Sequence, residues 1–120
     1  NYNQMVVDQL ADADVDRLFH ALADATRRDI VRRVVAGEHS ISDLARHYPM
    51  SMTAVQKHVA VLEGAGLVSK NRHGREQRVS GRVEALHEAQ RLLDMLEQVW
   101  RDRVDRMGAL LAEPTLEDPT

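Results

Sequence analysis

One stretch, Pro49–Arg82, constrains the fold of this chain more than any other. Its first half predicts a short amphipathic helix, because apolar residues recur at helical spacing and define one buried stripe. The stripe consists of Val55, Val59 and Leu62. Ser51 is a good N-cap residue for this helix, and the glycines at positions 64 and 66 are typical of a helix C-terminus. The opposite face carries mostly small and polar side chains.

The second half of the stretch predicts a two-stranded hairpin. Leu67–Lys70 and Gln77–Ser80 are the expected strands, and Asn71–Arg75 is the turn between them. Residues 66–82 carry five basic side chains and one acidic one, although the whole chain has a formal net charge of −3. A helix with a polar face followed by an Arg-rich hairpin is the layout of a winged helix-turn-helix. Taken alone, the basic stripe is equally compatible with a solvated hairpin.

Three further helices are expected before this stretch. The first covers residues 7–22, and the second, Ala25–Ala36, follows the N-cap residue Asp24. The third opens at Ser40 with the spacing of a capping box. Pro49 breaks the chain between the third and fourth helices, and two helices separated by so short a turn form a helix-turn-helix.

The longest predicted element is a helix over residues 83–111. Its apolar residues alternate three and four apart, as in a coiled-coil seam, until Arg103 breaks the register and Val104 resumes it one residue later. At ~1.5 Å per residue the helix would be roughly 40 Å long, longer than so small a domain can cover. The surplus apolar face predicts a second copy of the chain as partner; the alternative is that the helix lies across its own domain.

Length and composition set the class of protein. The 120 residues fit one domain, expected over residues 1–112 and followed by a disordered acidic tail over 113–120. The absence of cysteine excludes disulfides, thiolate metal sites and cysteine nucleophiles. No apolar run approaches the roughly 20 residues that span a bilayer, and no signal-peptide pattern is visible. A soluble cytoplasmic protein, mainly helical with a small β-hairpin, is therefore expected.

Catalysis is not expected. The six histidines and 19 carboxylates are scattered along the chain, and no nucleophile, Gly-rich phosphate loop or metal-ligand spacing emerges from them. A core this short also leaves little room for a catalytic cavity.

Three segments together are similar to one family of bacterial proteins. They read Phe19-His-Ala-Leu-Ala-Asp-Ala-Thr-Arg-Arg-Asp-Ile-Val31, Ser42-Asp-Leu-Ala45 and Ser51-Met-Thr-Ala-Val-Gln-Lys-His-Val-Ala-Val-Leu-Glu-Gly-Ala-Gly-Leu-Val68. In this order, and followed by a Gly-Arg wing, they resemble the ArsR/SmtB family of winged helix-turn-helix transcriptional regulators. The resemblance covers nearly the whole chain.

The resemblance implies a homodimer held by the first and last helices. Such a dimer presents two recognition helices to successive major grooves of double-stranded DNA, which suits an inverted-repeat operator. It also implies repression that an inducer relieves, although the operator, the inducer and the choice between repression and activation stay open. The residues expected at the dimer contact are Leu10, Leu86, Leu93, Leu96, Trp100 and Met107.

The chain departs from this family at the metal sites. Metal sensors of the family carry a Cys-x-Cys-type motif on the third helix, where this chain has Ser40-Ile-Ser-Asp-Leu44. Another family site uses Asp, His and Glu residues of the last helix across the dimer. Here His87, with Glu84 and Glu88 nearby, could gather a metal from two copies, and solvent-exposed charge is the alternative. No metal or other cofactor is expected.

Four residues of the fourth helix are expected to contact DNA. Ser51 and Thr53 stand at its start, where hydroxyls and free backbone N–H groups can hold a phosphate. Gln56 and Lys57 lie about one turn further along, where Gln can pair with adenine and Lys with guanine.

The hairpin supplies the remaining expected DNA contacts. Arg72, His73 and Arg75 occupy its tip, and Arg78 lies on the returning strand. Phosphate contacts are expected for all four, with Arg75 entering a minor groove.

Several residues have two expected roles. Arg27 and Arg28 reach either the DNA backbone or an acidic neighbour such as Asp24, and His58 contacts either its own domain or a phosphate. Two alternatives to a DNA-binding repressor remain: a winged-helix protein-interaction module without DNA binding, and a repressor that responds to a metal through His and carboxylate ligands.

Overall fold

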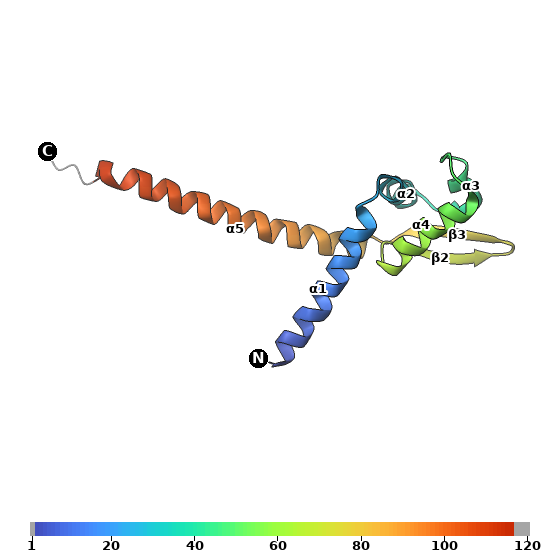
Figure 1. Ribbon diagram of the computed structural model, residues 1–120, viewed down its shortest axis with the longest axis horizontal. Helices are drawn as coiled ribbons and strands as arrows, with labels where there is room; N and C mark the ends of the chain where they lie inside the picture. Colours follow the sequence, from blue (N-terminus) through green and yellow to red (C-terminus); the bar gives the residue numbers. More distant parts are fainter. Residues whose placement is uncertain (1, 117–120) are drawn as a thin grey trace. The chain divides into compact units, whose positions relative to one another are not determined.

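The computed structural model describes the backbone of residues 2–116 and the side chains of residues 12–112. Contacts divide the chain into two units, Asn1–Ala89 and Gln90–Thr120. The elements in chain order are α1 (Tyr2–Leu22), α2 (Ala25–Ala36), β1 (His39–Ser40), α3 (Ile41–Ala45), α4 (Met52–Gly64), β2 (Val68–His73), β3 (Glu76–Gly81) and α5 (Val83–Leu116) (Figure 1). The predicted class, mainly helical with a small β-sheet and a long last helix, is confirmed.

Aliphatic side chains from the helices of the first unit and from strands β2 and β3 form one core. The predicted stripe of α4, Val55, Val59 and Leu62, is completely buried. It meets Ile30 of α2 and Leu44 of α3, which are also fully buried. Because this stripe is buried, the opposite face of α4 is turned outward.

Three side-chain caps begin the helices where the sequence predicted them. The Asp24 carboxylate accepts from the backbone N–H of Arg27 at 3.0 Å, and the Ser40 hydroxyl accepts from that of Asp43 at 3.0 Å. The Ser51 hydroxyl accepts from the N–H of Ala54 at 3.1 Å. Each bond satisfies one of the N–H groups that a helix N-terminus leaves unpaired.

The three strands form an antiparallel sheet in the order β1-β3-β2. The hairpin strands reach further toward the turn than expected, because His73 pairs with Glu76 and leaves a two-residue turn with Gly74 at φ +64°. Strand β1 was not predicted: two residues carry no periodicity, and only their pairing with Val79 and Arg78 makes them a strand. At the far end of β3, Gly81 lies so close to Val35 of α2 that a Cβ would come within 2.9 Å of its backbone.

The two terminal helices are longer than expected. Helix α1 begins at Tyr2 rather than at residue 7, and α5 continues to Leu116, five residues past the expected end at Leu111. The side chain of Leu10 lies outside the described residues, as do residues 117–120 of the expected tail.

A partly buried hydrogen bond holds the turn of the helix-turn-helix against α2. The Tyr48 hydroxyl, in the turn before α4, donates to the Asp29 carboxylate of α2 at 2.7 Å. Arg33 donates to the same carboxylate at 2.8 Å, and its guanidinium lies 5.9 Å from the centroid of the Tyr48 ring. Arg32 is a third partner of Asp29. The bonds from Tyr48, Arg33 and Arg32 hold the pKa of Asp29 well below its usual 3.8, while burial and the bond to Asp29 raise the pKa of Tyr48 to about 12.

We predict that Tyr48→Phe lowers the free energy of unfolding by about 1 kcal/mol, because it removes one hydrogen bond to a charged group and leaves the ring in place. Urea denaturation followed by circular dichroism measures this. Replacement of the exposed neighbour His47 by alanine is the control, and equal midpoints for the two variants would contradict the assignment.

The depressed pKa of Asp29 predicts a specific acid sensitivity. Because the folded-state pKa lies below the unfolded value of about 4, the carboxylate stabilises the fold above that pH and loses its contribution as the pH falls below it. Asp29→Asn should therefore flatten the fall of unfolding free energy between about pH 5 and about pH 2. Asp16→Asn, at an exposed carboxylate with no ion pair among the described residues, is the matched control; an equal flattening there would refute the prediction.

Candidate nucleic-acid interface

The outward face of α4 carries the residues that the sequence selected. Thr53, Gln56 and Lys57 are exposed, as are Met52 and Ala60 beside them. Ser51 is exposed too, but its hydroxyl oxygen already accepts the capping bond from Ala54, so its O–H remains as a donor. The helix thus presents a largely polar face to solvent, and the residues of its first turn are exposed.

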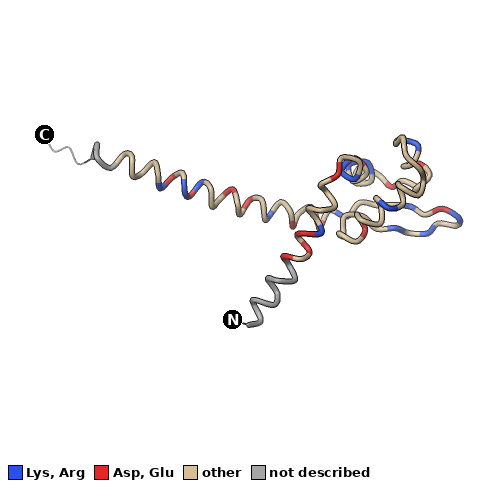
Figure 2. The backbone as a smooth tube through the Cα atoms, viewed as in Figure 1, with Lys and Arg blue, Asp and Glu red and all other residues tan. Residues whose placement is uncertain are grey.

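The tip of the β2–β3 hairpin carries the unneutralised positive charge of the wing. Arg72, His73 and Arg75 are exposed, and neither arginine forms an ion pair within the part of the chain that the structure describes. Lys70, further back on β2, lies 3.4 Å from the Glu63 carboxylate of α4 and links the wing to that helix. Basic residues follow the hairpin with one acidic interruption near its turn (Figure 2).

A hollow of about 290 Å³ lies between the start of α4 and the wing tip. Its lining residues are Ser40, Ile41, Ser42, Met52, Gln56, Arg75, Glu76 and Gln77. Two residues that are 19 positions apart in the sequence, Gln56 of α4 and Arg75 of the wing, therefore face the same space. Ser42 and Gln77 were not selected from the sequence. For Gln77 the signal is the hairpin register, which sets it opposite Arg72.

Arg78 differs from the other basic residues of the wing. Its guanidinium lies 3.3 Å from the carboxylates of both Glu38 and Glu76, and these bonds raise its pKa. Glu38 also accepts from the Ser80 hydroxyl at 2.9 Å, and the bonds from Ser80 and Arg78 lower the pKa of Glu38. Arg78 thus joins the wing to the loop after α2, and the DNA contact expected of it stays a prediction.

Arg27 and Arg28 close the C-terminus of α1. Arg27 donates to the carbonyl oxygens of Ala21 at 2.7 Å and His20 at 3.1 Å, and Arg28 donates to that of Leu22 at 2.8 Å. These are carbonyls that a helix end leaves without an intrahelical partner. A guanidinium pairing with Asp24 was one of the two roles expected from the sequence, and neither side chain makes it.

His58 contacts its own domain, the first of its two expected roles. Its Nδ1 atom lies 3.4 Å from the Arg27 guanidinium and 4.0 Å from the Asp24 carboxylate. The side chain is 22% exposed, so it faces the junction of α4 with the start of α2.

The residues expected at a dimer contact divide into two groups. Leu86 is partly buried against the core of its own unit. Leu93, Leu96, Trp100 and Met107 are 53–62% exposed. A stripe of large apolar side chains on α5 is therefore uncovered in the single chain.

The described residues contain neither a cluster of metal-ligating side chains nor a membrane-spanning helix. Among them no group of three or more His, Asp or Glu side chains is placed to hold a metal ion, His87 and Glu84 included. Within the same part of the chain, no helix is both long and apolar enough to cross a membrane.

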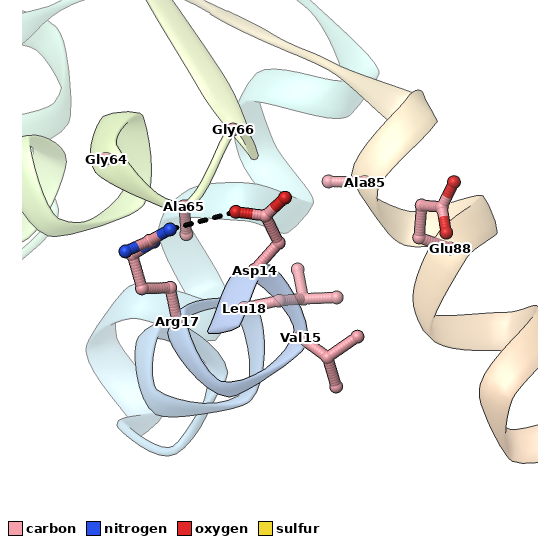
Figure 3. Close-up of a pocket in the computed structure, with 9 residues that line it drawn as sticks. All are labelled: Asp14, Val15, Arg17, Leu18, Gly64, Ala65, Gly66, Ala85 and Glu88. Atoms are coloured by element: carbon pink, nitrogen blue, oxygen red, sulfur yellow. Dashed lines mark hydrogen bonds and ion pairs between the residues drawn. The ribbon is translucent and has the colours of Figure 1, made fainter. Parts of the chain in front are cut away.

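A second hollow, of about 430 Å³, lies where α1, the end of α4 and the first turns of α5 meet (Figure 3). Small residues leave this space open: Gly64, Ala65, Gly66 and Ala85. Val15 and Leu18 supply apolar lining, and an ion pair of 2.9 Å between Arg17 and Asp14 stands at its edge. The lining residues offer no arrangement of nucleophile and base.

We predict that the Glu38 contacts hold the wing in place. Glu38→Ala removes one of the two carboxylate partners of Arg78 together with the acceptor of the Ser80 hydroxyl, so the amides of β3 should exchange with deuterium severalfold faster. Hydrogen exchange read by mass spectrometry checks this. Glu84→Ala, whose carboxylate is 4.0 Å from Arg82, is the control, and unchanged exchange in β3 of the Glu38 variant would show that the network does not restrain the wing.

Comparison with known proteins gives a consistent family of relatives. A sequence family described as "Helix-turn-helix domain" matches residues 22–70. The HTH-type transcriptional regulator Rv2034 of Mycobacterium tuberculosis is 49% identical over 53 residues, which are 44% of this chain and 50% of that protein. The transcriptional repressor SdpR of Bacillus subtilis is 30% identical over 60 residues, 50% of this chain and 67% of that protein. The matched region thus spans about half the length of the first relative.

Two solved structures extend the match over more of the chain. The ArsR-like transcriptional regulator from Rhodococcus sp. RHA1 is 30% identical, with a TM-score of 0.77, and the match covers 84% of this chain and 93% of that one. The homodimeric winged helix-turn-helix DNA-binding domain of Mb0332 from Mycobacterium bovis, described as a possible ArsR-family regulator, is 26% identical, with a TM-score of 0.56. That match covers 75% of this chain and 81% of the other.

Proposed function

Because this chain belongs to the ArsR family of winged helix-turn-helix transcriptional regulators, we propose that it is a sequence-specific DNA-binding regulator. It acts as a homodimer on an inverted-repeat operator, and its default action is repression. The observation that carries the proposal is the shared hollow: Gln56 of α4 and Arg75 of the wing line the same space from two elements.

Helix α4 reads the bases. Its buried stripe fixes its orientation, so Gln56 and Lys57 point outward one turn after the open N-terminus. Gln can pair with adenine N6 and N7, and Lys can reach guanine O6 and N7, in a major groove wide enough to admit a helix. Ser51 and Thr53 stand at the helix start, where phosphate binding positions the helix without selecting sequence.

The wing supplies affinity. Arg72 and Arg75 have no carboxylate partner among the described residues, so each can neutralise a phosphate without first breaking an ion pair. Arg75 stands at the two-residue turn and is the side chain best placed to enter a minor groove. Charge gathered on one hairpin lets a chain with a net charge of −3 bind a polyanion.

Two relatives support the mode of action. The repressor SdpR supports repression as the default, and the homodimeric Mb0332 domain supports a dimer. We further propose that the protein works in the cytoplasm, where bacterial DNA lies, and that it is not an enzyme and needs no metal or other cofactor to bind DNA. The inducer is not assigned.

We predict that the triple variant Gln56→Ala, Lys57→Ala, Arg75→Ala binds DNA at least about a hundredfold more weakly than the wild type, because each lost base contact is worth roughly 1–3 kcal/mol. Fluorescence anisotropy with DNA from upstream of the protein's own gene, titrated with salt, measures this. The slope of affinity against salt should also fall by about 0.9 for each phosphate contact removed.

The matched control removes one glutamine and two basic side chains from α5: Gln98→Ala, Arg103→Ala, Arg106→Ala. Its affinity should stay within about twofold of the wild type. Unchanged DNA binding by the first triple variant would refute the assignment of these three residues to the DNA contact. The lack of sequence-selective binding by the wild type at every salt concentration would favour a protein-interaction module, and release of DNA by added zinc would favour metal response through His87.

A further inference from the structure

Met52 is an apolar residue on the polar face of α4. It is the first residue of the helix and is 43% exposed. Among the residues of α4, all of which the structure describes, no other large apolar side chain is exposed. The exposed neighbours of Met52 on this face include Thr53, Gln56 and Lys57, which are proposed to contact DNA. Met52 therefore stands where the helix is proposed to meet the bases.

The hollow between α4 and the wing brings Met52 together with two polar side chains. Met52, Gln56 and Arg75 all line this space of about 290 Å³. Residues four positions apart on a helix are neighbours on one face, so Met52 and Gln56 lie side by side along the edge of α4. A ligand that reaches Gln56 through this hollow therefore also meets the Met52 side chain.

The chemistry of Met52 restricts what it can contact on DNA. A thioether has no N–H or O–H donor, so it offers no hydrogen bond to a phosphate oxygen. In the major groove, all four bases present hydrogen-bonding groups, and thymine alone adds a methyl group, at C5. Contact between an apolar side chain and this methyl group removes apolar surface from water, which is favourable. The unbranched, polarizable side chain of methionine also adapts readily to the position of the methyl group.

We propose that Met52 contacts the C5-methyl group of a thymine and thereby selects a T·A pair at one position of each operator half-site. This deepens the proposed function and rests on it. Met52 and Gln56 are about 6 Å apart along the helix axis, which is nearly two base-pair steps of about 3.4 Å. The two side chains therefore address different base pairs. The selected thymine lies within about two base pairs of the adenine that Gln56 reads.

Selection from a random library of duplex DNA is the first step of the test, because it requires no knowledge of the operator. The full wild-type chain and the variants Met52→Ala and Met52→Leu each select sequences from the same library. The wild type should select a motif with thymine fixed at one position of each half-site. Met52→Ala should lose the preference at that position alone. Met52→Leu should keep it, because leucine is apolar and close to methionine in volume.

Deoxyuridine in place of the selected thymine then tests the methyl contact itself, because it removes the methyl group and keeps every hydrogen-bonding group of the base. One such replacement in the selected DNA should weaken binding of the wild type about fourfold, the effect of one buried methyl group. Fluorescence anisotropy measures this. Met52→Ala should bind the thymine and deoxyuridine DNAs equally well. Thr53→Ser, which removes a methyl group from the adjacent residue, is the matched control and should still show the fourfold loss.

The possible outcomes separate this contact from the proposed function. An equal deoxyuridine effect in the wild type and in Met52→Ala would overturn the contact, and would leave Met52 only the structural role of covering Ile41 of α3, which lines the same hollow. A selected motif without a thymine that depends on Met52 would overturn the contact as well, while the proposed DNA binding would stand. Failure of the wild type to select any motif would overturn the proposed function and this contact together.

Discussion

Burial of one stripe on α4 sets the geometry on which the rest of the first unit depends. Val55, Val59 and Leu62 are fully withdrawn from solvent, and a helix this short has no freedom to rotate once they are buried. The face that carries Gln56 and Lys57 is therefore outward by necessity. At roughly 25 cal/mol per Å² of apolar surface, three buried aliphatic side chains outweigh any preference of the polar face. Packing of the buried stripe thus orients the outward face of α4. The polar residues on that face do not contribute to this packing, so they are free to vary with the surface that they bind.

Charged residues of the first unit divide into those that hold the scaffold and those that stay available. Arg27 and Arg28 satisfy carbonyls at the end of α1, Arg33 holds Asp29 together with Tyr48, and Arg78 ties the wing to Glu38. A cation held by two carboxylates would have to give up those bonds before it could neutralise a phosphate. The exposed arginines of the wing tip carry no such cost. Arginine therefore serves two purposes in this unit, holding the scaffold or staying available for a ligand. The partners of each arginine show which purpose it serves.

Local patterns in the sequence were sufficient for the helices, their caps and the hairpin. The Ser40 and Ser51 caps, the α4 stripe and the glycine turn each arise from interactions within a few residues, which a sequence displays directly. Contacts between distant residues were not visible: Tyr48 and Asp29 are 19 positions apart, and β1 exists only through its pairing with β3. The roles of Arg27 and Arg78 were missed for the same reason, since charge alone does not reveal a partner. Of the residues selected from the sequence, Gln56 of α4 and Arg75 of the wing line one shared hollow, although no DNA contact follows from that placement by itself.

The apolar stripe of α5 shows how a pattern can be recognised before its period is understood. Read as heptads, the seam is interrupted at Arg103. Read as 11-residue repeats, the same seam is continuous. A heptad seam supercoils to the left to keep facing its partner, whereas a stripe of 3.67 residues per turn drifts less from a straight helix and in the opposite sense. Residues that interrupt one period are therefore best judged against the periods that a straight helix allows.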